Sequence, residues 1–238
     1  METQKGRGTI LGLVPARGGS KGIARKNARL LAGKPLLAYT AKAALGAAGL
    51  SRVLLSTEDP EIASIGKSAG LEVPFIRPAE LAVDSTPMID VVVHVIQWFQ
   101  DQGLDYDAVC LLQPTSPLRS SATIDRCISL LWERDVDSVM SVRPVPTEHN
   151  PYWVYFEDAD GLLRPSMGDK PEVPCRQQLP RAFHADGSIF LARTKKILAE
   201  HSLKCKRMLG AVSPQEEAFD LDTEEQWRTL DRKLMTSK

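Results

Sequence analysis

A glycine-rich loop with several cationic side chains follows the first apolar segment of the chain and carries the clearest chemical signal. The loop reads Arg17-Gly-Gly-Ser-Lys-Gly-Ile-Ala-Arg-Lys-Asn27. Glycines let a backbone approach a ligand closely and turn its N–H groups towards an anion, and the Lys and Arg side chains add positive charge. The spacing matches neither the P-loop nor the dinucleotide-binding fingerprint. The loop predicts a polyphosphate site, and the alternative is a solvated basic turn.

Two aspartates near the C-terminus form a second candidate site. Asp220 and Asp222 are two residues apart, so an extended backbone presents both carboxylates on one side. Carboxylate oxygens are the ligands that hard divalent cations such as Mg²⁺ prefer. The residues alone favour a different interpretation, in which Asp222 only caps a helix that begins at about Thr223, because acidic residues are common at that position.

The elements that must position these residues alternate along the chain. Apolar runs and glycine or proline stops predict helices at residues 36–46, 60–69, 121–133 and 194–201, and from residues 87 and 223. They predict strands at residues 9–15, 52–57, 73–76, 108–113, 138–142, 188–192 and 208–212. The β–α alternation predicts a doubly wound, mostly parallel α/β sheet, which binds ligands at the carboxyl ends of its strands.

Residues 143–182 interrupt this alternation. They hold seven of the 16 prolines and the hairpin signal Asp158-Ala-Asp-Gly161. The segment is too short and too polar to form its own core, so it predicts a proline-rich excursion from a single domain that spans residues 1–238.

The charge balance and the hydropathy exclude some partners. Thirty Lys and Arg balance 30 Asp and Glu, so the chain lacks the basic excess that is typical of proteins that bind nucleic acid. The charge is uneven, because residues 1–34 hold eight bases and one acid, whereas residues 215–238 hold seven acids and four bases. No apolar run is long enough to span a membrane and no signal peptide is visible, so we expect a cytoplasmic protein without a nucleic-acid or membrane partner.

Six blocks of the sequence, in the same order, resemble those of the acylneuraminate cytidylyltransferases, which activate sialic acid and related nonulosonic 2-keto acids. They span most of the chain and are Val14-Pro-Ala-Arg-Gly-Gly-Ser-Lys-Gly-Ile-Ala-Arg-Lys-Asn27, Leu54-Leu-Ser-Thr-Glu-Asp59, Arg77-Pro-Ala-Glu-Leu-Ala-Val-Asp84, Leu111-Leu-Gln-Pro-Thr-Ser-Pro-Leu-Arg119, Arg176-Gln-Gln-Leu-Pro180 and Asp220-Leu-Asp222.

The resemblance implies a Rossmann-like nucleotidyltransferase that transfers CMP from CTP to an acidic acceptor, releases pyrophosphate and depends on Mg²⁺. It implies that Arg17 and Lys26 contact the reacting phosphate, that Arg77 reads the base, and that Asp220 and Asp222 hold the metal. Asp222 therefore joins Arg17 and Lys26 as a catalytic candidate. The nucleotide-binding candidates are Arg17, Gly18, Gly19, Ser20, Lys21, Asn27 and Arg77.

The resemblance further implies a homodimer in which the excursion packs against a second subunit and helps to bind the acceptor. The acceptor-binding candidates are Gln113, Arg176, Gln177, His184 and Asp186. For Gln113 the alternative is a strand-end amide that bonds to local backbone, and for Arg176 it is an ordinary surface arginine.

The block from His184 to Phe190 departs from the family pattern. His184 stands where some members have arginine, and Asp186 stands where members commonly have asparagine. Both changes alter the charge near the expected acceptor carboxylate. Another nonulosonic acid or a smaller acid such as a phosphonate therefore remains open as the acceptor. Two further alternatives also remain open: the enzyme could use a nucleoside triphosphate other than CTP, or the protein could bind a nucleotide without catalysing a reaction.

Overall fold

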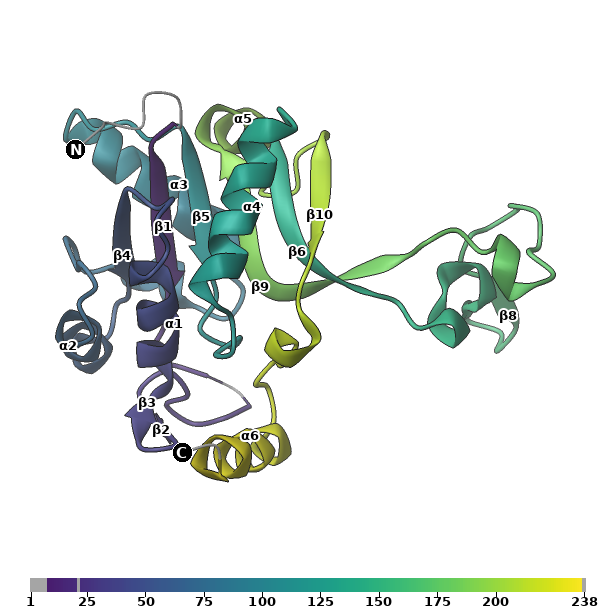
Figure 1. The fold of residues 1–238 in the computed structure, drawn as a ribbon, viewed down its shortest axis with the longest axis horizontal. Helices are drawn as coiled ribbons and strands as arrows, with labels where there is room; N and C mark the ends of the chain where they lie inside the picture. Colours follow the sequence, from purple (N-terminus) through teal and green to yellow (C-terminus); the bar gives the residue numbers. More distant parts are fainter. Residues whose placement is uncertain (1–7, 21, 237–238) are drawn as a thin grey trace.

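A six-stranded sheet forms the centre of the protein in the computed structural model, which describes residues 8–20 and 22–236 (Figure 1). The strand order is β10-β6-β9-β5-β1-β4, and β9 runs antiparallel to both of its neighbours while the other pairs are parallel. The strands are β1 (Ile10–Pro15), β4 (Arg52–Ser56), β5 (Ala108–Leu112), β6 (Ser138–Pro144), β9 (Phe183–Arg193) and β10 (Met208–Val212). The mostly parallel sheet expected from the sequence is confirmed.

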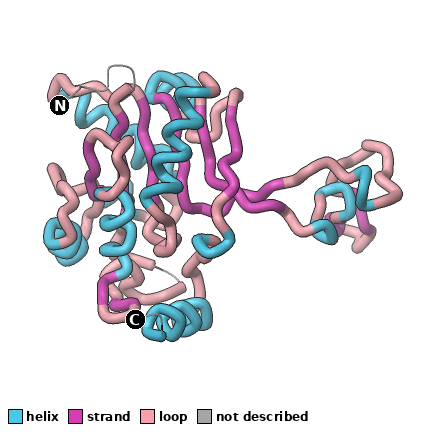
Figure 2. Tube along the Cα trace, viewed as in Figure 1, coloured by secondary structure: helices cyan, strands magenta, loops and turns pink. Residues whose placement is uncertain are grey.

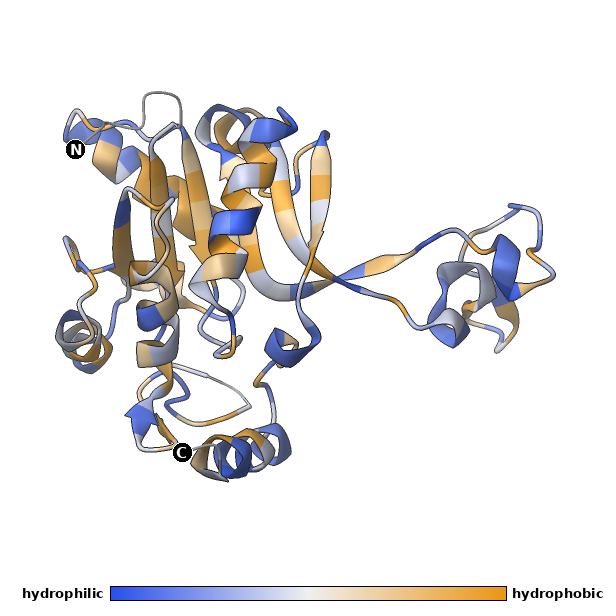
Figure 3. Cartoon of the chain, viewed as in Figure 1, coloured by the Kyte–Doolittle hydropathy of each residue, from blue (hydrophilic) through white to orange (hydrophobic). Residues whose placement is uncertain are grey.

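Helices cover both faces of this sheet, as the alternation of side chains in β1 illustrates. Ile10 and Val14 pack in one apolar cluster with α1, α2 and α4, whereas Leu11 and Leu13 pack in a second cluster with α3 and α5. The strands carry most of the strongly apolar ribbon in Figure 3. The helices are α1 (Leu36–Leu45), α2 (Pro60–Ser68), α3 (Met88–Asp101), α4 (Ser121–Glu133) and α5 (Thr194–Glu200). The doubly wound arrangement follows from this alternation.

The C-terminal helix, α6 (Glu224–Thr236), lies beside the glycine-rich loop and a small hairpin made of β2 (Leu30–Leu31) and β3 (Lys34–Pro35). A third apolar cluster joins them, in which Ile23 of the loop, Leu221 and Trp227 are buried. The cluster fixes the C-terminal segment against the loop.

Two sequence expectations about strands are corrected. The expected strand at residues 73–76 does not form: only Glu72 makes an isolated parallel bridge, to Leu54, and Pro74 follows without a backbone N–H to continue the ladder. The strand expected at residues 188–192 is longer, because β9 begins at Phe183 and pairs with the end of β6.

The excursion is an arm that projects from one side of the sheet (Figures 1 and 2). The end of β6 and the start of β9 pair as a ribbon that leads into it. At its tip β7 (Tyr155–Glu157) and β8 (Leu163–Pro165) form the expected hairpin, and one-turn 3₁₀ helices flank it at Thr147–His149, Pro151–Trp153 and Arg176–Gln178. That residues 1–238 form a single domain stays a prediction.

Two more 3₁₀ helices, Ala79–Ala82 and Gln215–Glu217, lie in the connections before α3 and after β10. Among the described residues, no helix is both long and apolar enough to cross a lipid bilayer.

Candidate functional site

A cavity of about 440 Å³ opens where β1 and β5 end and their connecting loops begin. This is the edge at which parallel sheets bind ligands. Of the sequence-predicted residues, the structure brings eight to its lining: Arg17, Gly19, Ser20, Lys26, Asn27, Arg77, Gln113 and Asp222. The remaining wall comes from Pro15, Gly22, Pro114 and Thr115 and from six residues in the range 81–91. Lys21 lies outside the described residues.

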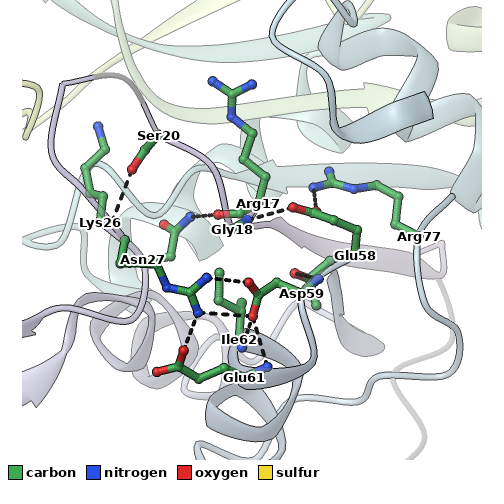
Figure 4. Close-up of polar contacts among 12 residues, drawn as sticks. Arg17, Gly18, Ser20, Lys26, Asn27, Glu58, Asp59, Glu61, Ile62 and Arg77 are labelled. Carbon is green, nitrogen blue, oxygen red and sulfur yellow. Dashed lines mark hydrogen bonds and ion pairs between the residues drawn. The ribbon is translucent and has the colours of Figure 1, made fainter. Parts of the chain in front are cut away.

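Glu58 connects the glycine-rich loop to Arg77 (Figure 4). One oxygen of its carboxylate accepts the Gly18 N–H at 2.7 Å, and the other accepts from Arg77 Nη2 at 2.7 Å. The Arg77 side chain is only 2% exposed, and its backbone N–H donates to the Thr57 carbonyl. The Gly18 N–H therefore already has a hydrogen-bond partner within the protein. The guanidinium of Arg77 is held in place by Glu58 where it lines the cavity.

Asp59 anchors the other side of the same loop. Its carboxylate caps α2 by accepting the Glu61 and Ile62 N–H groups, and it accepts from Arg25 Nη1 at 2.6 Å. These hydrogen bonds hold the pKa of Asp59 below its usual range. A Cβ at Gly18 would collide with this carboxylate, so the close approach of loop and cap requires a glycine there.

Ser20 and Asn27 use their polar groups to brace the loop from inside. The Ser20 hydroxyl donates to the Ile23 carbonyl and accepts the Lys26 N–H at 3.3 Å, and Asn27 Nδ2 donates to the Arg17 carbonyl at 3.0 Å. Asn27 is buried. Both residues therefore shape the loop through internal hydrogen bonds while they line the cavity.

Arg17 and Lys26 supply the positive charge of the cavity, and Figure 4 shows their side chains extending to the same side of the loop. Arg17 Nη1 pairs with Asp84 at 2.6 Å. Lys26 Nζ donates to the Leu221 carbonyl at 2.7 Å and contacts Asp222 Oδ1 at 3.1 Å. Two cationic groups therefore line the same cavity. Arg17 is held by a carboxylate, and Lys26 is held by a carbonyl oxygen and a carboxylate.

Asp220 and Asp222 flank the buried Leu221, so their side chains leave the extended backbone on the side away from that core residue. Burial and then the nearby Asp222 charge raise the pKa of Asp220 above its ordinary value. Asp222 lines the cavity, whereas Asp220 is hydrogen-bonded to Thr115, a residue that also lines it. Two carboxylates in proximity favour a cation between them.

The helix-capping alternative for Asp222 is removed, because two other residues cap α6. Thr223 Oγ1 accepts the Gln226 N–H at 3.2 Å, and Gln226 Oε1 accepts the N–H groups of Asp222 and Thr223 at 2.8 and 2.9 Å. This reciprocal arrangement is a capping box. The Asp222 carboxylate pairs instead with Lys26.

Gln113 follows the end of β5 and is held by Arg119. Arg119 Nη1 donates to the Gln113 carbonyl at 3.2 Å and to the Ser188 carbonyl at 2.5 Å, and Nη2 donates to Thr40 Oγ1 at 3.0 Å. Arg119 is 3% exposed, and burial lowers its pKa to about 10. Its hydrogen bonds leave the Gln113 side chain to line the cavity.

The other four acceptor candidates are not brought to this cavity. Arg176 and Gln177 are exposed on the arm, where Arg176 lines a separate hollow of about 200 Å³. His184 is exposed and its Nδ1 contacts the Ala185 carbonyl. Asp186 is buried among serines: its carboxylate accepts from the Ser141 and Ser213 hydroxyls and from the Ser188 N–H. The sequence placed Asp186 near an acceptor, but its carboxylate points into the protein.

Three residues that shape the site were not among those predicted from the sequence: Glu58, Asp84 and Arg119. All three lie within the family blocks. Their role depends on partners that are far away in the sequence, such as Gly18 for Glu58 and Arg17 for Asp84. No local pattern could have supplied those pairings.

Among the described residues, no group of three or more His, Cys, Asp or Glu side chains is placed to hold a metal ion by itself. Mg²⁺ is commonly bound through one or two carboxylates plus substrate phosphates and water. Asp220 and Asp222 fit this pattern of donors next to a cationic cavity.

Comparison with known proteins gives the family. Residues 11–154 match the model of the family described as cytidylyltransferase. The chain is 35% identical over 231 residues to the CMP-N,N'-diacetyllegionaminic acid synthase of Legionella pneumophila, which covers 95% of this chain and 96% of that protein. It is 30% identical over 216 residues to the N-acylneuraminate cytidylyltransferase of Escherichia coli, covering 91% of this chain and half of that protein's length.

Among solved structures, a CMP:2-keto-3-deoxy-manno-octonic acid synthetase complexed with CTP superposes with a TM-score of 0.69. It covers 97% of this chain and all of its own, and at 15% identity this likeness concerns the fold alone. The family model and the two relatives lead to one conclusion. The chain belongs to the cytidylyltransferase family.

Proposed function

We propose that the protein transfers CMP from CTP to a nonulosonic 2-keto acid and releases pyrophosphate in an Mg²⁺-dependent reaction. The observation that carries the proposal is the cavity in which Arg17, Lys26 and Asp222 meet beside Gln113. A relative that is 35% identical over nearly its full length is named as a synthase of this product class, which supports the same acceptor class here.

In the proposed reaction, the acceptor hydroxyl forms a bond to the α-phosphorus of CTP and loses its proton to water. The bond from the α-phosphorus to the oxygen that bridges to the β-phosphate breaks, and pyrophosphate leaves. Negative charge grows on the phosphate oxygens, so positioned cations lower the barrier. Arg17, Lys26 and Arg77 are the described cationic side chains that line the cavity, and Arg77 is already paired with Glu58.

Arg17 and Lys26 are both paired, which has a consequence for nucleotide binding. A triphosphate that binds Arg17 competes with Asp84, and one that binds Lys26 competes with Asp222. Both ion pairs are partly exposed, so their loss costs little compared with several charge-assisted hydrogen bonds to phosphate.

Asp220 and Asp222 are the residues that would hold Mg²⁺, because they provide two oxygen-bearing groups beside the phosphate-binding cations. When bound, the ion would neutralise charge on phosphate oxygens. A cation at this place would also relieve the unfavourable burial of the Asp220 charge, which the raised pKa of that residue reports.

The assay that tests the proposal measures pyrophosphate release from CTP and Mg²⁺ with a panel of acceptors: N-acetylneuraminate, legionaminic and pseudaminic acids, an eight-carbon 2-keto acid and a phosphonate. UTP, ATP and GTP replace CTP in parallel. We expect release with CTP and at least one nine-carbon 2-keto acid. Release only with the phosphonate, or only with another triphosphate, would replace the proposal by one of the alternatives. Binding of CTP without release in any mixture would leave a nucleotide-binding protein.

We further propose that the protein is a cytoplasmic homodimer that docks through the arm (residues 143–182). Tyr155, Phe156, Leu162 and Leu163 of the arm hairpin are 50–66% exposed, and such a group of apolar side chains is typical of an interface. Arg176 and Gln177 are far from their own chain's cavity, so we propose that they serve the acceptor bound by the second copy.

Light scattering tests the dimer directly. The wild type should have twice the mass of one chain, and the double variant Phe156→Glu/Leu163→Glu should have the mass of one chain. Because both side chains are 66% exposed in the single chain, the substitutions should leave the fold of the sheet intact, as circular dichroism measures. A wild type with the mass of a single chain would contradict the proposal.

A further inference from the structure

Gly187 lies close to Gln113, which lines the cavity, and none of the roles above uses it. Its φ is +75°, in the left-handed region that favours glycine. A Cβ at this position would lie 3.6 Å from Gln113 Oε1 and 3.8 Å from Asp220 Oδ2. These are ordinary van der Waals distances, so a methyl group would fit there. It would occupy the space between the Gln113 amide and the Asp220 carboxylate.

An irregularity in β9 places Gly187 there. Met140 of β6 pairs with Phe190, but two residues later Val142 pairs with Ala185, so residues 186–189 of β9 lie opposite Ser141 alone. The backbone groups of this bulge therefore cannot all bond to the neighbouring strand. Side chains satisfy them instead, because buried N–H and carbonyl groups need partners.

Asp186 holds the bulge from one side. Its buried carboxylate accepts the Ser188 N–H at 3.0 Å together with the hydroxyls of Ser141 and Ser213. Ser141 Oγ in turn accepts the Ile189 N–H at 2.8 Å. These bonds join β6, β9 and the end of β10 around the residues that flank Gly187.

Arg119 holds the bulge from the other side. Its Nη1 donates both to the Ser188 carbonyl and to the Gln113 carbonyl, so one buried guanidinium sets the position of the bulge relative to the end of β5. Ser188 is thus bound through its N–H by Asp186 and through its carbonyl by Arg119. The separation of Gly187 from Gln113 is fixed by these buried bonds.

We propose that Gly187 is a specificity-determining residue of the acceptor subsite, whose missing side chain leaves room between Gln113 and Asp220 for the crowded reacting carbon of a 2-keto sugar acid. Asp186 and Arg119 are positioning residues that hold it there. This inference rests on the proposed function.

The chemistry of the acceptor explains why the room matters. In the ring form of a 2-keto sugar acid, the reacting hydroxyl sits on a carbon that also bears the carboxylate, the ring oxygen and another carbon. This carbon carries no hydrogen, so it is bulkier than that of a primary or secondary alcohol. A glycine opposite it removes the contact that any side chain would make.

The test uses Gly187→Ala and Gly187→Asn in the full chain. Asparagine tolerates a positive φ better than other side chains, so Gly187→Asn adds bulk with less backbone strain. The matched control is Gly103→Ala, because Gly103 has a φ of +71° and nothing within 4 Å of a Cβ. All variants are measured for melting temperature, for CTP binding by calorimetry with Mg²⁺, and for the KM and kcat of pyrophosphate release.

We expect both Gly187 variants to raise the KM for the 2-keto acid about tenfold or more, as an added methyl group does in a fitted pocket. The Kd for CTP should stay within about twofold, whereas Gly103→Ala should lower only the melting temperature. An unchanged acceptor KM in both Gly187 variants, with an active wild type, would overturn this inference and leave the proposed function intact. A wild type that releases no pyrophosphate with any acceptor would instead overturn the proposed function, and this inference with it.

Discussion

The ammonium group of Lys26 donates to the backbone carbonyl of Leu221 at 2.7 Å, across 195 residues of sequence. The same group contacts Asp222 Oδ1 at 3.1 Å. The C-terminal segment is thus fixed to the glycine-rich loop in two ways: the Leu221 side chain is buried, and the Lys26 side chain bonds to the segment. The residues proposed to bind phosphate and those proposed to bind metal are therefore held in one arrangement by a few short contacts.

Lys26→Met should lower kcat by about 100-fold, because it removes a positioned cation from the phosphate site. Lys26→Arg keeps the charge but not the compact ammonium, so it should retain an intermediate rate. Steady-state pyrophosphate release at saturating CTP measures both. Lys195→Met is the control, since Lys195 is exposed on α5 and does not line the cavity. A similar kcat loss in the control would show that the effect is not local.

Asp222→Asn should lower turnover strongly and raise the Mg²⁺ concentration needed for half-maximal rate, while the melting temperature changes by no more than a few degrees. The stability should persist because Thr223 and Gln226, not Asp222, cap α6. Glu224→Gln is the matched control: Glu224 pairs with Arg29 at 2.5 Å near the same helix start but does not line the cavity. Equal losses of activity in both variants would contradict a specific role for Asp222.

The sheet could be predicted from the sequence because local patterns determine it. Continuous apolar runs such as that of β1 and proline-started helices such as α2 are independent of distant partners. The strand expected at residues 73–76 failed because Pro74 lacks the N–H that a ladder needs.

The site could be predicted only in part. The glycine-rich loop indicates its chemistry by residue type, whereas the metal role of the two aspartates came only from the family resemblance. The contact between Lys26 and Asp222 joins residues 196 positions apart, and no local pattern indicates it. The direction of Asp186 could not be predicted, because the bulge in β9 breaks the alternation of side chains on which strand patterns depend. The buried role of Arg119 could not be predicted either, because arginines near loops are usually exposed.

Asp186→Asn should leave the ranking of acceptors unchanged, since the carboxylate faces Ser141 and Ser213 rather than the cavity. An amide keeps one oxygen for the Ser188 N–H, and a serine hydroxyl can turn to accept from the new NH₂ group. The melting temperature should therefore fall only slightly, whereas Asp186→Ala should lower it by several degrees because it leaves buried donors unpaired. Pyrophosphate release with the acceptor panel measures the ranking. A shift in favour of N-acetylneuraminate with an unchanged melting temperature would show that Asp186 does face the acceptor, because a loosened bulge would lower the melting temperature as well.

The contribution of Asp220 to the stability of the protein should fall as the pH rises through the range in which Asp220 loses its proton. Burial and the neighbouring Asp222 raise the pKa of Asp220 in the folded state above its ordinary value of 3.8. Between these two pKa values the folded chain binds more protons at this group than the unfolded chain does, so the contribution of Asp220 to the free energy of unfolding decreases with pH. Well below pH 3.8 Asp220 is protonated in both states and does not change the free energy of unfolding. Well above its folded pKa, the destabilisation by the buried charge is complete.

Asp220→Asn should therefore raise the melting temperature near neutral pH relative to the wild type, and this gain should shrink as the pH falls towards 3.8. The amide keeps an oxygen for the contacts with Leu221 and Thr115. Melting curves at a series of pH values, for the wild type and the variant, measure the difference. Added Mg²⁺ should stabilise the wild type more than the variant at neutral pH, because only the carboxylate binds a hard cation well. A variant that melts below the wild type at neutral pH would show that the Asp220 charge stabilises the ligand-free fold.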